Sequence, residues 1–231
     1  RLIPGEDTTI EYKPKYLDAS LISQSPSIAI GQAKQEIIRM GQYSVQGLQE
    51  AMQHINTYDK KHVNTAAQIE EAINSLDQKT TEYLVSISKK SLSGHDSKVH
   101  NVLLENIRDI ERIGDHVENL FELTEFIENN GAQLSEDAMQ ELNDMLELVV
   151  QTASLAIQSL DQLDVNVAKQ VLANEDQIDH MERKLRKNHI VRLNNGICTG
   201  SAGVIFVDLI SNLERVGDHA ANIAESVIEV K

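Results

Sequence analysis

The sequence predicts an all-α protein, with six long helices arranged as two tandem three-helix bundles. Its composition favours helix over sheet, because aromatic residues make up 3% of the 231 positions and there are only three prolines and no tryptophan. The chain also repeats itself: an offset of about 105 residues aligns Glu70 with Glu175, and one of about 103 aligns Glu111 with Glu214. Two copies of a three-helix unit of about 105 residues are therefore expected.

The first helix of the first unit has a clear start signal. Ser25 is followed by Pro26, which places a serine at the N-cap and a proline at the first helical position. The apolar periodicity then continues to about Thr57. Residues 1–24 lie outside the repeat and contain two of the three prolines, so we expect a linker or N-terminal tail there.

The second helices begin at equivalent aspartates. Asp59 and Asp164 occupy matching places in the two units, and each is expected to cap the N-terminus of its helix. These helices are expected to end near Ser93-Gly94 and Asn195-Gly196, because glycine is the usual C-terminal capping residue.

The third helix of the first unit is expected to end at Asn130-Gly131, and Ser135 with the two acidic residues that follow it opens the next unit. The predicted division of the chain is a tail of residues 1–24, a first unit of residues 25–131 and a second unit of residues 132–231. Helices of about 25 to 35 residues are typical of antiparallel bundles with short connections.

Charge, cysteine content and missing motifs exclude several classes of protein. The net charge of −15 argues against a nucleic-acid partner, and the single cysteine rules out an internal disulfide. No apolar run approaches the roughly 18 residues needed to span a bilayer. The sequence has neither a catalytic nucleophile motif nor a glycine loop for phosphate. We therefore expect a protein that is not an enzyme.

One motif occurs at the same place in both units. The sequence ERIGDHVEN, which begins at Glu111, recurs as ERVGDHAAN from Glu214, with six of nine positions identical. Each copy places a second carboxylate, Asp115 or Asp218, four residues later on the same helix face. Like charges at this spacing cost a free helix a few tenths of a kcal/mol, and the central glycine costs about 1 kcal/mol relative to alanine. The motif therefore indicates either a tight packing joint or a cation site in each unit.

The second helix of the second unit carries a matching acidic pair, Glu175 and Asp179. This pair flanks its apolar stripe as Glu214 and Asp218 flank theirs, so the two acidic ridges can meet between the helices. Four carboxylates that meet repel one another unless a cation neutralises them. All-oxygen ligands suit iron or a hard cation, and the residues do not distinguish iron, manganese, zinc and calcium. A solvated acidic face is the alternative that the pattern leaves open.

The first unit has a poorer version of this arrangement. Glu70 matches the first acid of the pair, but Asn74 stands in place of the second. A cation site formed by Glu70, Glu111 and Asp115 would therefore be one carboxylate weaker. Arg108 lies three residues before Glu111, so a surface salt bridge is an alternative role for that acid.

The remaining motif residues have structural expectations. His116 and His219 are turned about 100° from the acids and are expected to flank them. Arg112 and Arg215 are turned likewise and are expected to pair with acids on neighbouring helices. The central glycine of each copy lies on the apolar stripe, where it allows two helices to approach closely.

These features resemble those of the PhoU family. The resemblance rests on the repeated motif at the last helix of each unit, on the acidic pattern from Glu175 to Asp179 and on the duplicated three-helix units, and it covers residues 25–231. Residues 2–29 are also similar to the junction of bacterial sodium/phosphate cotransporters, where a membrane domain precedes a PhoU-like domain. The chain begins at Arg1 rather than Met, as expected of a piece of such a transporter.

The resemblance implies a regulatory role in phosphate uptake, at the cytoplasmic side of the inner membrane. It also implies metal clusters bound by paired acidic motifs. The implied ligands are Glu175, Asp179, Glu214 and Asp218 in the second unit, and Glu70, Glu111 and Asp115 in the first.

We therefore expect a regulatory domain of a sodium-dependent phosphate transporter, in which cation occupancy sets the packing of the helices. Its expected partners are the membrane transport domain of the same polypeptide, other phosphate-signalling proteins and a second copy in a homodimer. One alternative is a free-standing PhoU protein that represses phosphate signalling through an ABC transporter. Another is a carboxylate-bridged metalloenzyme, but no histidine has a glutamate three residues before it, as such sites require.

Overall fold

The computed structural model describes residues 10–230 as a set of helices joined by short connections. The elements are α1 (Leu21–Gln24), α2 (Pro26–Thr57), α3 (Lys60–Ile87), α4 (Gly94–Asn130), α5 (Glu136–Gln162), α6 (Val165–Asn194) and α7 (Gly200–Val230). Every regular element in this part of the chain is a helix, which confirms the predicted all-α fold. The sequence predicts the six long helices and misses the short α1.

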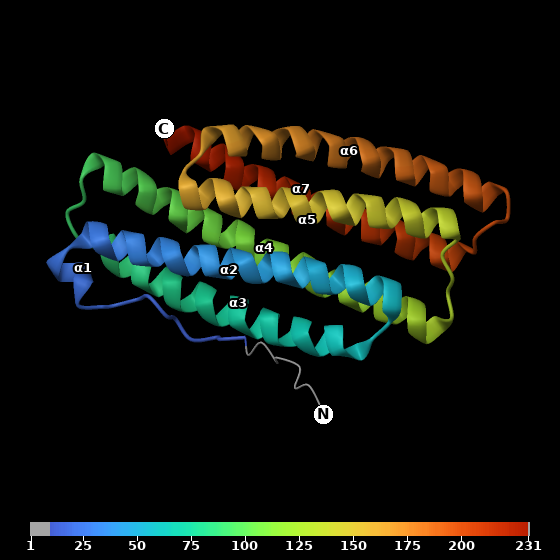
Figure 1. Ribbon diagram of the computed structural model, residues 1–231, viewed down its shortest axis with the longest axis horizontal. Helices are drawn as coiled ribbons and strands as arrows, with labels where there is room; N and C mark the ends of the chain where they lie inside the picture. The colour runs from blue at the N-terminus through green and yellow to red at the C-terminus, as the bar shows by residue number, and fades with distance from the viewer. Residues whose placement is uncertain (1–9, 231) are drawn as a thin grey trace, which may run out of the picture.

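The six long helices lie side by side in two groups of three (Figure 1). Helices α2, α3 and α4 pack against one another, and so do α5, α6 and α7. The groups meet where α2 contacts α5 and where α4 contacts α7. The first helices of the two repeats therefore face each other, as do the third helices, and the second helices, α3 and α6, lie on opposite outer sides (Figure 1).

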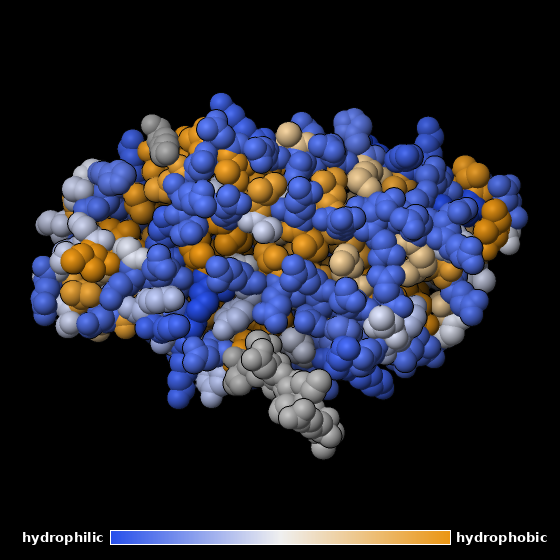
Figure 2. Space-filling view, viewed as in Figure 1, coloured by the Kyte–Doolittle hydropathy of each residue, from blue (hydrophilic) through white to orange (hydrophobic). Residues whose placement is uncertain are grey.

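The apolar stripe of each third helix forms the centre of the core. Leu103 and Ile110 of α4 and Leu209 and Leu213 of α7 have no exposed surface. Figure 2 shows hydrophilic side chains over most of one face, with hydrophobic side chains visible in clusters among them. Within residues 10–230, no helix combines the length and the hydrophobicity needed to cross a membrane.

Side-chain caps define the starts of α3, α5 and α6 as predicted, whereas Ser25 stands at the predicted N-cap of α2 without a capping hydrogen bond from its side chain. The carboxylates of Asp59 and Asp164 accept hydrogen bonds from backbone N–H groups in the first turns of α3 and α6, and the Ser135 hydroxyl does the same for α5. Gly131 ends α4 in the left-handed conformation, with φ of 59°. The prediction that the second helix ends near Ser93 is wrong, because α3 ends at Ile87 and the Ser93 hydroxyl caps the start of α4.

The segment before α2 packs against the first unit. Glu36 of α2 is fully buried, and its carboxylate accepts hydrogen bonds from the backbone N–H groups of Lys15 and Tyr16. The Tyr83 hydroxyl of α3 donates to the carbonyl oxygen of Asp18 at 2.9 Å. Residues 1–9 of the expected tail lie outside the described residues, whereas residues 10–20 dock on α2 and α3.

Gly41 of α2 lies at a close contact between the two units. A Cβ atom at Gly41 would lie 2.3 Å from Cδ1 of Ile157 on α5, whereas one at Gly31 of the same helix would meet nothing within 4 Å. We expect Gly41→Ala to lower the free energy of unfolding by about 1–3 kcal/mol, because Ile157 must move within a packed core.

Gly31→Ala is the matched control. It is expected to raise the free energy of unfolding by roughly 0.5–1 kcal/mol through helix propensity alone. Urea unfolding followed by circular dichroism measures both variants, and equal effects of the two substitutions would contradict the assigned contact.

Candidate metal centre

Three carboxylates from two helices come together in the second unit. Glu175 and Asp179 lie one turn apart on α6, and Asp218 lies on α7. One oxygen atom from each of the three lies within 4.8 Å of the others, a spacing that allows all three to bind one metal ion. Within residues 10–230, no other group of three His, Cys, Asp or Glu side chains has this spacing.

A glycine places the two helices close enough for this arrangement. A Cβ atom at Gly217 would lie 3.2 Å from Cδ1 of Ile178, the residue just before Asp179. Gly114 makes the same contact with Ile73 in the first unit, also at 3.2 Å. The predicted close approach of helices at the repeated glycine is therefore confirmed in both units.

Mutual repulsion shows that the carboxylates of the second unit form one electrostatic group. Burial raises the pKa of Glu175, and the charges of Asp179 and Asp218 raise it further. Burial likewise raises the pKa of Asp218, with Asp179 as the next cause. Glu214 lies outside the group of three, but burial and then the charges of Asp218 and Asp179 raise its pKa too. The four predicted carboxylates thus lie together, with three at ligand spacing and Glu214 beside them.

Arginines on α6 pair with some of the acids in and beside this group. Arg183 donates to the Asp179 carboxylate at 3.1 Å, although its side chain is 60% exposed and such surface pairs contribute little. Arg186 pairs with Glu182. Glu182 is an acid that the sequence pattern does not single out, and its charge adds to the raised pKa of Glu214. It lies seven residues after Glu175, so two helical turns on the same face were the available signal.

The structure does not assemble a matching group in the first unit. The carboxylates of Glu111 and Asp115 lie beside Arg112, at 3.7 and 3.0 Å. The expectation that Arg112 pairs with a neighbouring helix is therefore wrong, because its side chain reaches acids one residue before and three residues after it on α4. Glu70 faces another acid of α4, Glu118, and contributes to raising the pKa of that group.

The histidine and asparagine of each motif join the two units. His116 and Asn119 of α4 donate hydrogen bonds to the Asn212 side-chain oxygen of α7, at 2.9 and 3.2 Å. In reverse, His219 and Asn222 of α7 donate to the Asp109 carboxylate of α4, at 2.8 and 2.9 Å. The six residues of this α4–α7 clamp are Asp109, His116, Asn119, Asn212, His219 and Asn222.

The clamp is a role that the sequence does not predict, because its motifs indicate only that the histidines flank the acids. The two imidazole rings lie 5.6 Å apart between their centroids, so they contact each other as well as their acceptors. Burial lowers the pKa of His116. Asp109 and Asn212 occupy equivalent places two residues before each motif, which was the only signal of their role in the sequence.

Removing charge from the group of three carboxylates tests whether these side chains repel one another. Glu175→Gln/Asp218→Asn is expected to raise the free energy of unfolding of the metal-free protein at neutral pH by a few tenths of a kcal/mol. Because the folded-state pKa values of these acids lie above the ordinary 4.5 and 3.8, the wild type gains stability as the pH falls from neutral toward about 4.5. The variant should gain less over this window.

Urea unfolding in the presence of a chelator at several pH values measures this difference. Glu105→Gln/Glu229→Gln removes the same charge at two exposed positions, on α4 and α7, and serves as the control. A variant less stable than both the control and the wild type would show that these carboxylates do not repel.

Comparison with known proteins agrees with this architecture. A family model described as PhoU domain matches residues 37–124 and 142–227, one match in each unit. The phosphate-specific transport system accessory protein PhoU homolog 1 of Thermotoga maritima is 24% identical over 208 residues, which cover 86% of this chain and 85% of that protein. A PhoU homolog of Xylella fastidiosa is 27% identical over 193 residues, or 84% of this chain and 80% of that protein.

Two crystal structures show the same fold. PhoU from Pseudomonas aeruginosa superimposes with a TM-score of 0.81 at 19% identity, over 87% of this chain and 95% of that one. The phosphate transport system regulatory protein PhoU of Streptococcus pneumoniae gives a TM-score of 0.80 at 19% identity, over 89% and 96%. Since the family model matches most of the chain in two copies, the chain belongs to the PhoU domain family.

Proposed function

We propose that this protein is a PhoU-type regulator of phosphate transport that binds metal between α6 and α7. The regulatory role is supported by relatives that are named as accessory proteins of a phosphate-specific transport system and that align over most of their length. The metal site rests on the three carboxylates at ligand spacing. In this proposal the protein is not an enzyme, and the role of the site is to bind a cation.

The residues that would hold the cation are Glu175 and Asp179 of α6 and Asp218 of α7. Carboxylate oxygens suit iron, manganese or another hard cation. A bound cation supplies positive charge, which removes the repulsion among these groups. Glu214 lies one turn before Asp218 and adds a fourth negative charge beside them. Because the ligands belong to two helices, occupancy stabilises one relative position of α6 and α7.

Helix α7 connects this site to the first unit. Asp218 is followed directly by His219, which belongs to the α4–α7 clamp, and the charges of His219 and His116 lower the otherwise raised pKa of Asp218. We propose that a shift of α7 on cation binding reaches α4 through the clamp. Such a regulator needs two packing states with different affinities for the cation.

A second candidate is the finer hypothesis that a membrane transport domain belongs to the same polypeptide. The relatives named as accessory proteins favour the separate accessory protein over this hypothesis. Docking of residues 10–20 on α2 and α3 provides a firm attachment for any preceding segment, and in either case the proposed location is the cytoplasmic side of the membrane. Hydrophobic spans in the genomic reading frame before Arg1 would support the fused form, and a start codon close to Arg1 would exclude it.

Metal analysis tests the site directly. We expect protein purified without a metal-affinity tag to retain stoichiometric metal after dialysis, and Glu175→Gln/Asp218→Asn to lose it, because each ligand helix then lacks one charged donor. Glu111→Gln/Asp115→Asn removes the two motif acids of α4, the counterparts of Glu214 and Asp218, and is expected to keep the metal. A wild type that binds none after supplementation with iron, manganese, zinc or calcium would exclude the site.

The regulatory role is tested by phosphate uptake in the bacterium that encodes this chain. Deleting its coding sequence should raise the rate of uptake of labelled phosphate in phosphate-rich medium, because a negative regulator is lost. Wild type and Glu111→Gln/Asp115→Asn should restore the low rate, whereas Glu175→Gln/Asp218→Asn should not.

An unchanged uptake rate after the deletion would exclude regulation of phosphate transport. Full restoration by Glu175→Gln/Asp218→Asn would instead separate regulation from metal binding and leave the regulatory role in place.

A further inference from the structure

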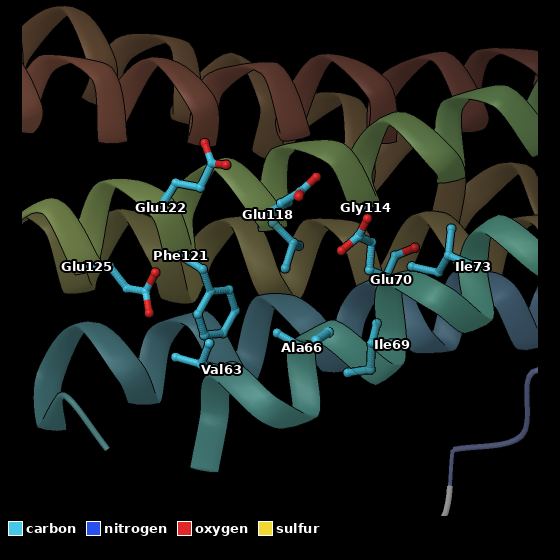
Figure 3. Close-up of a pocket in the computed structure, with 13 residues that line it drawn as sticks. Val63, Ala66, Ile69, Glu70, Ile73, Gly114, Glu118, Phe121, Glu122 and Glu125 are labelled. Atoms are coloured by element: carbon cyan, nitrogen blue, oxygen red, sulfur yellow. The ribbon is translucent and has the colours of Figure 1, made fainter. Parts of the chain in front are cut away.

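An apolar cavity opens between α3 and α4 in the first unit, and the metal-site proposal does not use it. Its volume is about 260 Å³. In Figure 3, Val63, Ala66 and Ile69 of α3 and Phe121 of α4 line the space between the two helices. The Phe121 ring is held in place, because the ring of the buried His54 stacks on it at 5.3 Å between centroids.

Glutamates surround this cavity on both helices. Glu70 belongs to α3, and Glu118, Glu122 and Glu125 belong to α4 (Figure 3). The three on α4 are spaced by four and three residues, so they follow one face of the helix for about 10 Å. Among the described residues, no ion pair joins any of the four to a lysine, arginine or histidine. Burial raises the pKa of Glu118, and the charges of Glu70 and Glu122 raise it further.

The second unit has different side chains in the equivalent groove between α6 and α7. At the positions of Ala66 and Ala67 it has the larger Val171 and Leu172, of which Val171 is fully buried and Leu172 packs against the core. The two small side chains in the first unit therefore leave apolar surface of α3 open beside Phe121.

The glutamates also differ between the units. The residues equivalent to Glu118 and Glu125 are Ala221 and Ile228. The first unit therefore has two additional carboxylates at the mouth of its apolar cavity, whereas the pocket at the equivalent place in the second unit is lined mainly by polar residues around the proposed metal site. Apolar walls and unpaired negative charge in the same groove fit a ligand that has apolar and cationic groups side by side.

We propose that the groove between α3 and α4 binds a basic amphipathic helix of a partner protein. One large apolar side chain of this helix enters the cavity beside Phe121, and lysines or arginines spaced along its sides pair with Glu118, Glu122 and Glu125. The volume exceeds the roughly 150 Å³ that encloses a benzene ring and is below the 300 Å³ at which typical small-molecule pockets begin. A helix in a groove uses this combination of an anchoring side chain and flanking charges.

The test uses the full chain and two fluorescein-labelled peptides. The first is a lysine–leucine amphipathic helix with one phenylalanine in the centre of its apolar face, and the second has alanine at that position. By fluorescence anisotropy, the phenylalanine peptide should bind at least about tenfold more tightly, because one aromatic side chain becomes buried. Equal affinity of the two peptides would show attraction by charge alone and would overturn the proposal.

Two variants separate the cavity from the charge. Ala67→Leu introduces the side chain that the second unit has at this position, at an exposed residue, and should remove the tenfold preference for phenylalanine. Glu118→Gln/Glu122→Gln should weaken both peptides by about tenfold and reduce the dependence of binding on salt. Glu105→Gln/Glu229→Gln, with the same net charge, should bind as the wild type does.

Two results would contradict the proposed groove. One is an undiminished phenylalanine preference in Ala67→Leu that circular dichroism shows to be folded. The other is metal analysis that finds an ion bound to the wild type and lost in Glu118→Gln/Glu122→Gln, since the glutamates would then be metal ligands.

Discussion

The contact of one glycine with one isoleucine determines the distance between the second and third helices in each unit. Gly217 against Ile178 brings α6 and α7 together, and Gly114 against Ile73 does the same for α3 and α4. At this separation, side chains that flank the contact are near one another whether their charges attract or repel. The carboxylates between α6 and α7 and the glutamates around the cavity both depend on this spacing, because apolar packing at the glycine offsets their repulsion.

The two units place different side chains on the same arrangement of helices. In the second unit, Val171 and Leu172 stand in place of the two alanines, and three acids gather at ligand spacing. In the first unit, Asn74 stands in place of an acid, Arg112 contacts Glu111 and Asp115, and the remaining glutamates surround an apolar cavity. Since the backbone contacts are alike, substitutions at a few positions account for the difference between the proposed metal site and the proposed peptide groove.

Local features of the sequence predict most of the fold. Capping residues such as Asp59, Asp164 and Gly131 act within one turn, so their roles can be inferred without tertiary structure. Ser93 is mistaken for a helix end because the following glycine suggests a C-terminal cap, although Asp96 three residues later is a signal for a helix start. The correctly and the incorrectly predicted helix ends both depend on residues that are close together in the sequence.

The site is harder to predict because its parts come from separate helices. A helical wheel places Glu175, Asp179 and Asp218 beside their apolar stripes, but the clamp pairs residues about a hundred positions apart. Nothing local to His116 indicates that its face meets α7 rather than solvent. The cavity cannot be predicted from the sequence either, because it depends on the distance between two alanines of α3 and the Phe121 ring.

The α4–α7 clamp has the form of a two-fold symmetric subunit interface, because each copy of the motif donates to the acceptor that precedes the other copy. In a dimer of identical chains both acceptors would be the same residue, and dilution would separate the halves. Within one polypeptide the halves stay at a high effective concentration, and Asp109 can differ from Asn212. Covalent linkage therefore gives the molecule the geometry of a dimer at any protein concentration. It also allows the two sides of the clamp to differ in charge.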